Sequence, residues 1–195
     1  MKRHCLTLLL ALTLVACGLE ERSYPLDEGM LTAPQSEAAL KVGYRVPRRF
    51  LAMSDEYIDY LQQRNLQDDP FAPTVRALYV DTITGANIAL TDMRMSPAEQ
   101  TEERLEDPEK AFNAAGGWDD VSMERFRMNG YPRVAHVRMS NPVTTADRYY
   151  FYNERKAFMS LDLVYPTPMA EAYRPYFESM LATVREQYEI TITAE

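Results

Sequence analysis

The chain offers few side chains that could act as an acid, a base or a nucleophile. Its two histidines are His4 and His136, and its two cysteines are Cys5 and Cys17. His136 lies in the β-prone run Val134-Ala135-His136-Val137-Arg138, and neither a Gly-x-Ser-x-Gly elbow nor a Ser-x-x-Lys pair accompanies it. We therefore expect a hydrogen-bonded histidine inside a strand, with a catalytic role as the alternative, and we predict no catalytic residues.

Carboxylates are plentiful and gather in three places: Asp68-Asp69, Asp119-Asp120, and a ridge of Glu99, Glu102, Glu103 and Glu106. The ridge suits the solvated face of a helix. Asp119 and Asp120 follow Trp118, so this loop could bind a sugar, a cation or a protein partner, whereas the alternative is an ordinary surface loop. A sugar hydrolase would need two acids that face each other across a cleft. No loop of spaced oxygen ligands of the EF-hand kind is present, and we predict neither a metal nor a cofactor.

Four consecutive aromatic residues, Tyr149 to Tyr152, place rings on both faces of the strand that contains them. One pair belongs to the core. Tyr150 and Tyr152 would form an exposed binding face unless a helix layer covers them, and we expect the covered arrangement while keeping both as candidate binding residues. Neither a phosphate-binding glycine loop nor a basic patch appears, so we predict no nucleic-acid partner.

The N-terminus is typical of an exported protein. Met1 to His4 is a basic start, and Cys5 to Val15 is an apolar stretch of eleven residues, which is too short to span a bilayer. The segment Leu14-Val15-Ala16-Cys17 resembles a bacterial lipobox. This resemblance implies cleavage before Cys17 and acylation of that cysteine, and several acyl chains would anchor the protein stably. The alternative is an ordinary signal peptide followed by an incidental cysteine.

The signal divides the chain into residues 1–16 (signal peptide), 17–40 (lipidated tether) and 41–195 (one domain). Loss of Lys2 and Arg3 with the signal changes the net charge from −8 to −10, which disfavours nucleic acid and anionic lipid as partners. The domain then contains no thiol, so it can form no disulfide and no cysteine metal site. Gly18 occupies the place where an aspartate retains similar lipoproteins at the inner membrane, which favours an outer-membrane anchor facing the periplasm.

The remaining sequence predicts an antiparallel sheet with helices packed on it. We expect strands over 42–46, 75–83 and 87–95, a hairpin of 121–128 and 131–139 that turns at Asn129-Gly130, and a hairpin of 148–153 and 156–165. Helices are expected over 55–64 after a Ser54 cap, over 97–105 after a Ser96 capping box, over 108–112 and over 172–188. The fold class is therefore α+β with an antiparallel meander.

This pattern resembles the PsbP-like α/β/α sandwich of photosystem II extrinsic proteins and of many small bacterial lipoproteins. Three stretches carry the resemblance: the strand and capped helix start Thr91 to Pro97, the hairpin Phe126 to Pro132, and the final strand and helix that contain Phe158 to Leu161 and Tyr173 to Leu181. Proteins of that kind are mostly non-enzymatic binding or assembly factors, and the resemblance implies the same role here.

We therefore expect an envelope lipoprotein, attached to the membrane through its lipid, that binds another envelope protein in the assembly or maintenance of a complex. Trp118, Asp119 and Asp120 are its candidate contact residues, together with Tyr150 and Tyr152. The alternatives are an immunity or inhibitor lipoprotein against a secreted toxin, and a hydrolase that acts on cell-wall or sugar substrates through carboxylates.

Overall fold

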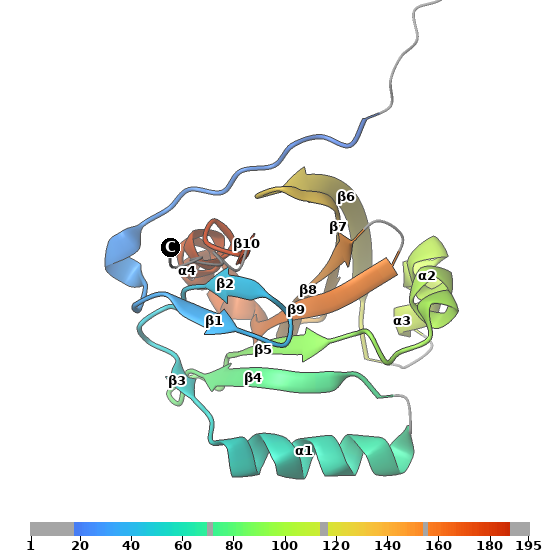
Figure 1. The fold of residues 1–195 in the computed structure, drawn as a ribbon, viewed down its shortest axis with the longest axis horizontal. Coiled ribbons are helices and arrows are strands. Elements are labelled where there is room, and N and C mark those ends of the chain that lie inside the picture. Colours follow the sequence, from blue (N-terminus) through green and yellow to red (C-terminus); the bar gives the residue numbers. More distant parts are fainter. Residues whose placement is uncertain (1–17, 70–71, 114–116, 154–155, 188–195) are drawn as a thin grey trace, which may run out of the picture.

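A curved seven-stranded antiparallel sheet forms the framework of the molecule in the computed structural model (Figure 1). The structure describes residues 18–69, 72–113, 117–153 and 156–187. The strand order is β3-β4-β5-β9-β8-β7-β6, and each neighbouring pair is antiparallel. The predicted α+β class with an antiparallel sheet is therefore confirmed. The strands are β3 (Leu51–Ala52), β4 (Thr74–Val80), β5 (Asn87–Asp92), β6 (Asp120–Met128), β7 (Tyr131–Ser140), β8 (Thr144–Asn153) and β9 (Lys156–Pro166).

The β6–β7 hairpin turns at Asn129 and Gly130, as the sequence predicts. Both residues have positive φ, 51° and 89°, which asparagine and glycine adopt more readily than other residues. The Asn129 side-chain amide also donates hydrogen bonds to the carbonyl oxygens of Leu181 and Val184, at 2.8 and 2.9 Å. The turn is therefore tied to the C-terminal part of the domain. The predicted hairpins β4–β5 and β8–β9 form as well.

One face of the large sheet is covered by a small second sheet and helix α4 (Figure 1). The small sheet has the order β1-β2-β10, with β1 (Gln35–Glu37), β2 (Val42–Tyr44) and β10 (Arg185–Glu186), and α4 spans Ala170–Leu181 after the short 3-10 helix Thr167–Met169. The residues buried between these layers form the first core, and they include Leu31, Phe151, Met159, Leu161, Tyr173 and Met180.

The end of α4 differs from our prediction. We expected the helix to continue to Tyr188, whereas it ends at Leu181. The Thr183 hydroxyl donates to the carbonyl oxygen of Met180 at 2.7 Å, and β10 then pairs with β2. The apolar spacing predicted too long a helix because it includes Val184. This residue is buried in the first core, but it lies beyond the end of the helix.

Helices α2 (Ala98–Glu106) and α3 (Pro108–Asn113) cover the opposite face of the sheet. The residues buried beneath them form the second core, which includes Leu105, Phe112, Ala135, Val137, Tyr150 and Tyr152. The helix layer expected over these rings is thus present. The N-cap of α2 is Pro97 and not Ser96, the residue that our predicted capping box placed there.

Helix α1 (Asp55–Asp68) packs along β4 at the end of the molecule farthest from the N-terminal segment (Figure 1). Its predicted cap is confirmed, because the Ser54 hydroxyl accepts a hydrogen bond from the backbone N–H of Tyr57. The helix is one turn longer than we expected. Ile58 is buried, whereas Tyr57 and Tyr60 are exposed. Within the described ranges, none of the helices has the length and apolar character needed to cross a membrane.

Candidate functional site

His136 is held between two carboxylates on the face of the sheet that carries the first core. Its Nδ1 lies 2.9 Å from Oε1 of Glu124, and its Nε2 lies 2.7 Å from Oδ1 of Asp147. The ring stacks on Tyr149 with 4.2 Å between the centroids. The imidazole can donate to both carboxylates only when both nitrogens carry a proton. The expected hydrogen-bonded strand histidine is therefore confirmed, and both of its nitrogens are engaged.

A β-bulge in β7, opposite Arg127, puts Glu124 opposite His136. Met128 pairs with Tyr131 beside the turn and Phe126 pairs with Val134, so two residues of β7, Pro132 and Arg133, lie opposite the single residue Arg127 of β6. The extra residue shifts the register by one position. Without it, the two-residue turn would place Met123 opposite the histidine, and the carboxylate would point to the other face of the sheet.

The two carboxylates are ionised for different reasons. Burial alone would raise the pKa of Asp147, but the hydrogen bonds from His136 and Tyr165 outweigh burial and lower that pKa. The Tyr165 hydroxyl donates to Asp147 Oδ2 at 2.6 Å. Glu124 is more exposed, and the hydrogen bonds from Arg22 lower its pKa to about 2, with a further contribution from His136. The cluster is thus a charged network that extends from the buried Asp147 to the surface.

Arg22 connects this network to the N-terminal segment. Its guanidinium binds both carboxylate oxygens of Glu124 and lies over the Phe126 ring, with 4.1 Å from Cζ to the ring centroid. The backbone N–H of Arg127 donates to the carbonyl oxygen of Glu20, and the N–H of Arg22 donates to the carbonyl oxygen of Arg127, both at 2.8 Å. The N-terminal segment therefore satisfies the backbone N–H and C=O groups of Arg127, the β6 residue opposite the bulge.

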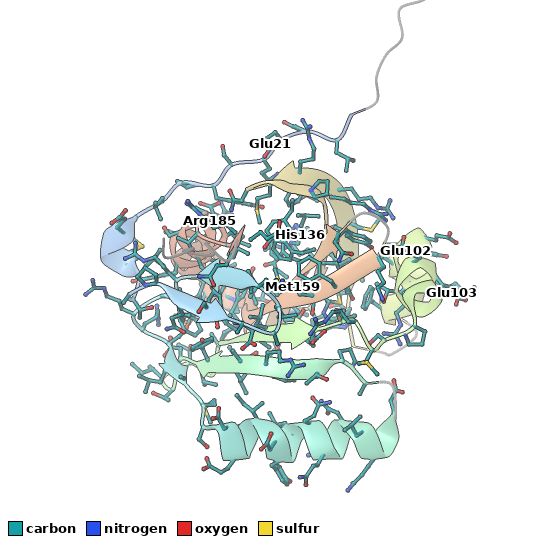
Figure 2. The ribbon with its side chains drawn as sticks, in the orientation of Figure 1. Glu21, Glu102, Glu103, His136, Met159 and Arg185 are labelled. Atoms are coloured by element: carbon teal, nitrogen blue, oxygen red, sulfur yellow. The ribbon has the colours of Figure 1, made fainter. Side chains whose placement is uncertain are left out.

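Residues 18–40, which we predicted as part of a tether, lie along the domain beyond this contact as well. Tyr24 packs against the first core, and Leu31 is fully buried in it. The N–H of Asp27, which precedes the short 3-10 helix Glu28–Met30, donates to Ser179 Oγ of α4 at 3.0 Å. Figure 2 shows Glu21 on this segment, at the end of the molecule opposite α1. Cys17 and the predicted signal peptide lie outside the described residues.

A cavity of about 100 Å³ opens beside His136. Its walls include Tyr24, Arg138, Tyr149, Tyr165 and Arg174. This volume holds about three water molecules. The described residues that line it include no serine, cysteine, threonine or lysine. Nowhere in the described part of the chain, this cavity included, do three or more His, Cys, Asp or Glu side chains lie close enough together to hold a metal ion.

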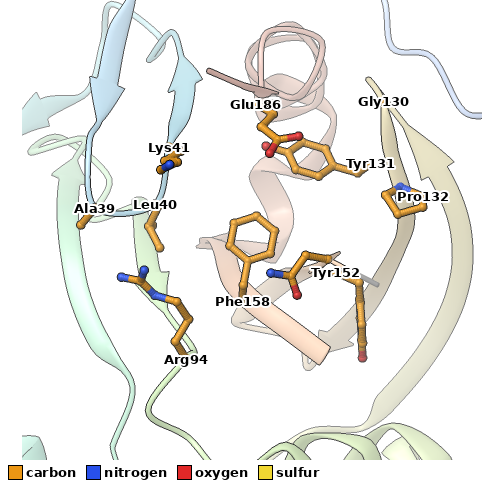
Figure 3. Close-up of a pocket in the computed structure, with 11 residues that line it drawn as sticks. Ala39, Leu40, Lys41, Arg94, Gly130, Tyr131, Pro132, Tyr152, Phe158 and Glu186 are labelled. Carbon is orange, nitrogen blue, oxygen red and sulfur yellow. The ribbon is translucent and has the colours of Figure 1, made fainter. Parts of the chain in front are cut away.

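A larger cavity of about 360 Å³ opens between the β1–β2 turn and the start of β7 (Figure 3). Lys41 and Arg94 lie along one wall, the rings of Tyr131 and Phe158 form the floor and opposite wall, and Glu186 stands at the rim. Arg94 is paired with the buried Asp92 at 2.6 Å, and Asp92 also binds Arg76 at 2.9 Å. Asp92 thus binds two guanidinium groups, of which that of Arg94 lines the cavity.

The predicted loop residues lie at the start of β6. Trp118 is half-buried against the second core, whereas Asp119 and Asp120 are exposed. The N–H of Asp119 donates to the carbonyl oxygen of Ser140 at 2.8 Å. Successive residues along a strand point to opposite faces, so the two carboxylates do not face each other across a cleft. Neither lines the two cavities described above, and the binding role of this loop stays a prediction.

Tyr150 and Tyr152 are buried beneath α2 and α3, 3% and 1% exposed. The Tyr152 hydroxyl donates to Glu102 Oε1 at 2.7 Å, and Glu102 also pairs with Arg133 at 2.9 Å. Glu102 is therefore not simply a member of a solvated ridge. The two rings do not form an exposed binding face, because the helix layer covers them.

We did not predict that Arg22, Glu124, Asp147 and Tyr165 form one network. The Asn129-Gly130 turn predicts that β6 pairs with β7, but it does not indicate the bulge that brings Glu124 opposite His136. Arg22 was assigned to a tether because its surroundings show no periodicity.

Comparison of the sequence with protein-family models and with curated proteins gives no match. Among solved structures, the chain is similar to the solution structure of cyanobacterial PsbP (CyanoP) from Synechocystis sp. PCC 6803. The TM-score is 0.47 and the sequence identity 12%, over 80% of this chain and 91% of that chain. This likeness assigns no activity, ligand or partner to the present chain.

Proposed function

We propose that this chain is a lipoprotein of the bacterial cell envelope whose domain binds another envelope protein and has no enzymatic activity. Acylation of Cys17 anchors it, and Gly18 favours the outer membrane, with the domain facing the periplasm. The engagement of His136 supports the non-enzymatic role, because both ring nitrogens are occupied by carboxylates. After removal of the signal, no other imidazole and no unmodified thiol remains in the chain.

The proposed binding surface is the outer edge of β6, which is the edge of the strand that faces away from β7. In the described residues, Arg127 is the position of β6 that makes backbone hydrogen bonds across this edge, to Glu20 and Arg22. Nearer Asp120, no backbone hydrogen bond from another described residue crosses this edge, so we propose that an added strand pairs with the outward N–H and C=O groups there. Trp118 and the exposed Asp119 lie where this open edge begins, which supports the predicted contact loop.

Photocrosslinking in intact envelopes tests this proposal. A photoreactive amino acid replaces Ser122, which is exposed on β6, and a matched control carries it at Asp59, which is exposed on α1. We expect one discrete protein adduct from position 122 and none of that size from position 59. Trp118→Ala should weaken the adduct more than Trp118→Phe, which keeps an aromatic ring against the second core. The same pattern of adducts from both positions, or none from either, would contradict the proposal.

The identity of the adduct separates the remaining alternatives. A secreted toxin recovered at position 122 would favour the immunity or inhibitor role. A carboxylate-dependent hydrolase would instead lose activity on cell-wall sugars in the Asp119→Asn and Asp120→Asn variants.

A further inference from the structure

We propose that the N-terminal segment holds the domain in one orientation on the membrane, with the Arg127 end of β6 against the lipid headgroups and α1 facing away. This inference rests on the proposed acylation of Cys17, and it adds a membrane-facing surface that the anchor alone does not define. Its basis is that the segment binds the domain almost immediately after the anchor position.

The distance between the anchor and the domain is short. The carbonyl oxygen of Glu20 accepts a backbone hydrogen bond from the N–H of Arg127. Three Cα–Cα steps separate Cys17 from Glu20, which span at most about 11 Å even when fully extended. The headgroup layer of one leaflet is about 5–8 Å thick. A lipidated Cys17 therefore keeps Arg127 within or next to the headgroups.

Several contacts of different kinds fix the segment once it reaches the domain. The two backbone hydrogen bonds to Arg127 form a short parallel bridge at the sheet edge. The Arg22 guanidinium is held by Glu124 and the Phe126 ring. Asp27 then binds Ser179 of α4. Because the segment is held at both β6 and α4, it cannot rotate relative to the domain. The domain therefore keeps a fixed orientation relative to the anchor.

The opposite surface follows from the strand order. Helix α1 packs on β4, and β4 is separated from β6 by five strand spacings of about 4.8 Å, roughly 24 Å along the curved sheet. Figure 1 shows α1 and the N-terminal segment at opposite ends of the molecule. The exposed rings of Tyr57 and Tyr60 on α1 therefore face away from the membrane.

Depth-dependent fluorescence quenching tests the orientation. Because the mature domain contains no cysteine, Arg127→Cys and Asp59→Cys each provide one free thiol for a fluorophore when Cys17 is acylated. The docking of Arg127 uses its backbone, and its side chain is 51% exposed, so the label leaves the two backbone hydrogen bonds in place. The full lipidated chains are reconstituted into phosphatidylcholine vesicles with or without brominated phospholipid, and flotation first shows whether each protein is bound.

We expect at least a threefold greater fractional quenching at position 127 than at position 59. Insertion of ten Gly/Ser residues between Gly18 and Leu19 should remove most of this difference, since the anchor then no longer limits the distance. Bound protein with equal quenching at the two positions overturns the orientation and leaves the anchoring proposal intact. Protein that does not float with the vesicles overturns both.

Discussion

The contact between Arg22 and Glu124 should couple the N-terminal segment to the stability of the domain, and a double-mutant cycle measures this coupling. Full conversion of the lowered pKa of Glu124, about 2 against a usual 4.5, would give about 3 kcal/mol. The two side chains are 32% and 43% exposed, however, and solvent screens such a pair to about 0.5–1 kcal/mol. The cation–π contact of Arg22 with Phe126 adds about 0.5–1 kcal/mol that does not involve Glu124.

We therefore expect Arg22→Ala to lower the free energy of unfolding by about 1–2 kcal/mol, with a coupling of about 0.5–1 kcal/mol to Glu124→Ala. Urea unfolding of the four proteins in detergent gives both values, and Arg174→Ala, which removes an exposed pair with Glu171, is the matched control. Hydrogen exchange at the Arg127 amide should accelerate in Arg22→Ala and stay unchanged in the control. A coupling near zero, together with unchanged exchange at Arg127, would refute the docking that we describe.

Three further predictions concern the same network and the turn beside it. Asp147→Asn should lower the free energy of unfolding by about 3 kcal/mol in urea titrations, because its buried carboxylate accepts from both His136 and Tyr165; a loss below about 1 kcal/mol would contradict this. Because Glu124 has a lowered pKa, its contribution to stability should be complete above about pH 4.5 and lost as the pH falls toward 2, and unfolding of Glu124→Gln should be less pH-dependent over that range. Asn129→Ala should lower the free energy of unfolding by about 2 kcal/mol, and Asn129→Gly should lower it less. Both variants lose two amide hydrogen bonds, but only alanine is strained at φ 51°. Equal shifts of the melting temperature in the two variants would argue against the strain.

Local turn chemistry and alternation were enough to predict the sheet. Asn129-Gly130 specifies its own turn, and the alternation of Leu161 and Leu163 with polar residues places them in the core of β9. Such features depend on residues close in the sequence, so they can be read without the fold. The same alternation would place Ala157 on that face, but the extra residue Phe158 in β9 puts Ala157 in the second core.

The candidate network could not be predicted because it depends on long-range pairing. Arg22 and Glu124 are 102 positions apart, and the position of Glu124 opposite His136 requires the bulge in β7, which no short pattern signals. His136 was correctly predicted as a hydrogen-bonded strand residue, whereas its partners follow only from the shifted register.

The most direct test of the proposed anchor is the mass of the N-terminal peptide of the protein isolated from its own membranes. We expect a peptide that begins at Cys17 and carries the mass of several acyl chains, and a Cys17→Ser variant that is neither acylated nor retained in the membrane fraction. An unmodified N-terminal peptide, or a Cys17→Ser variant that remains in the membrane fraction, would contradict the proposed anchor.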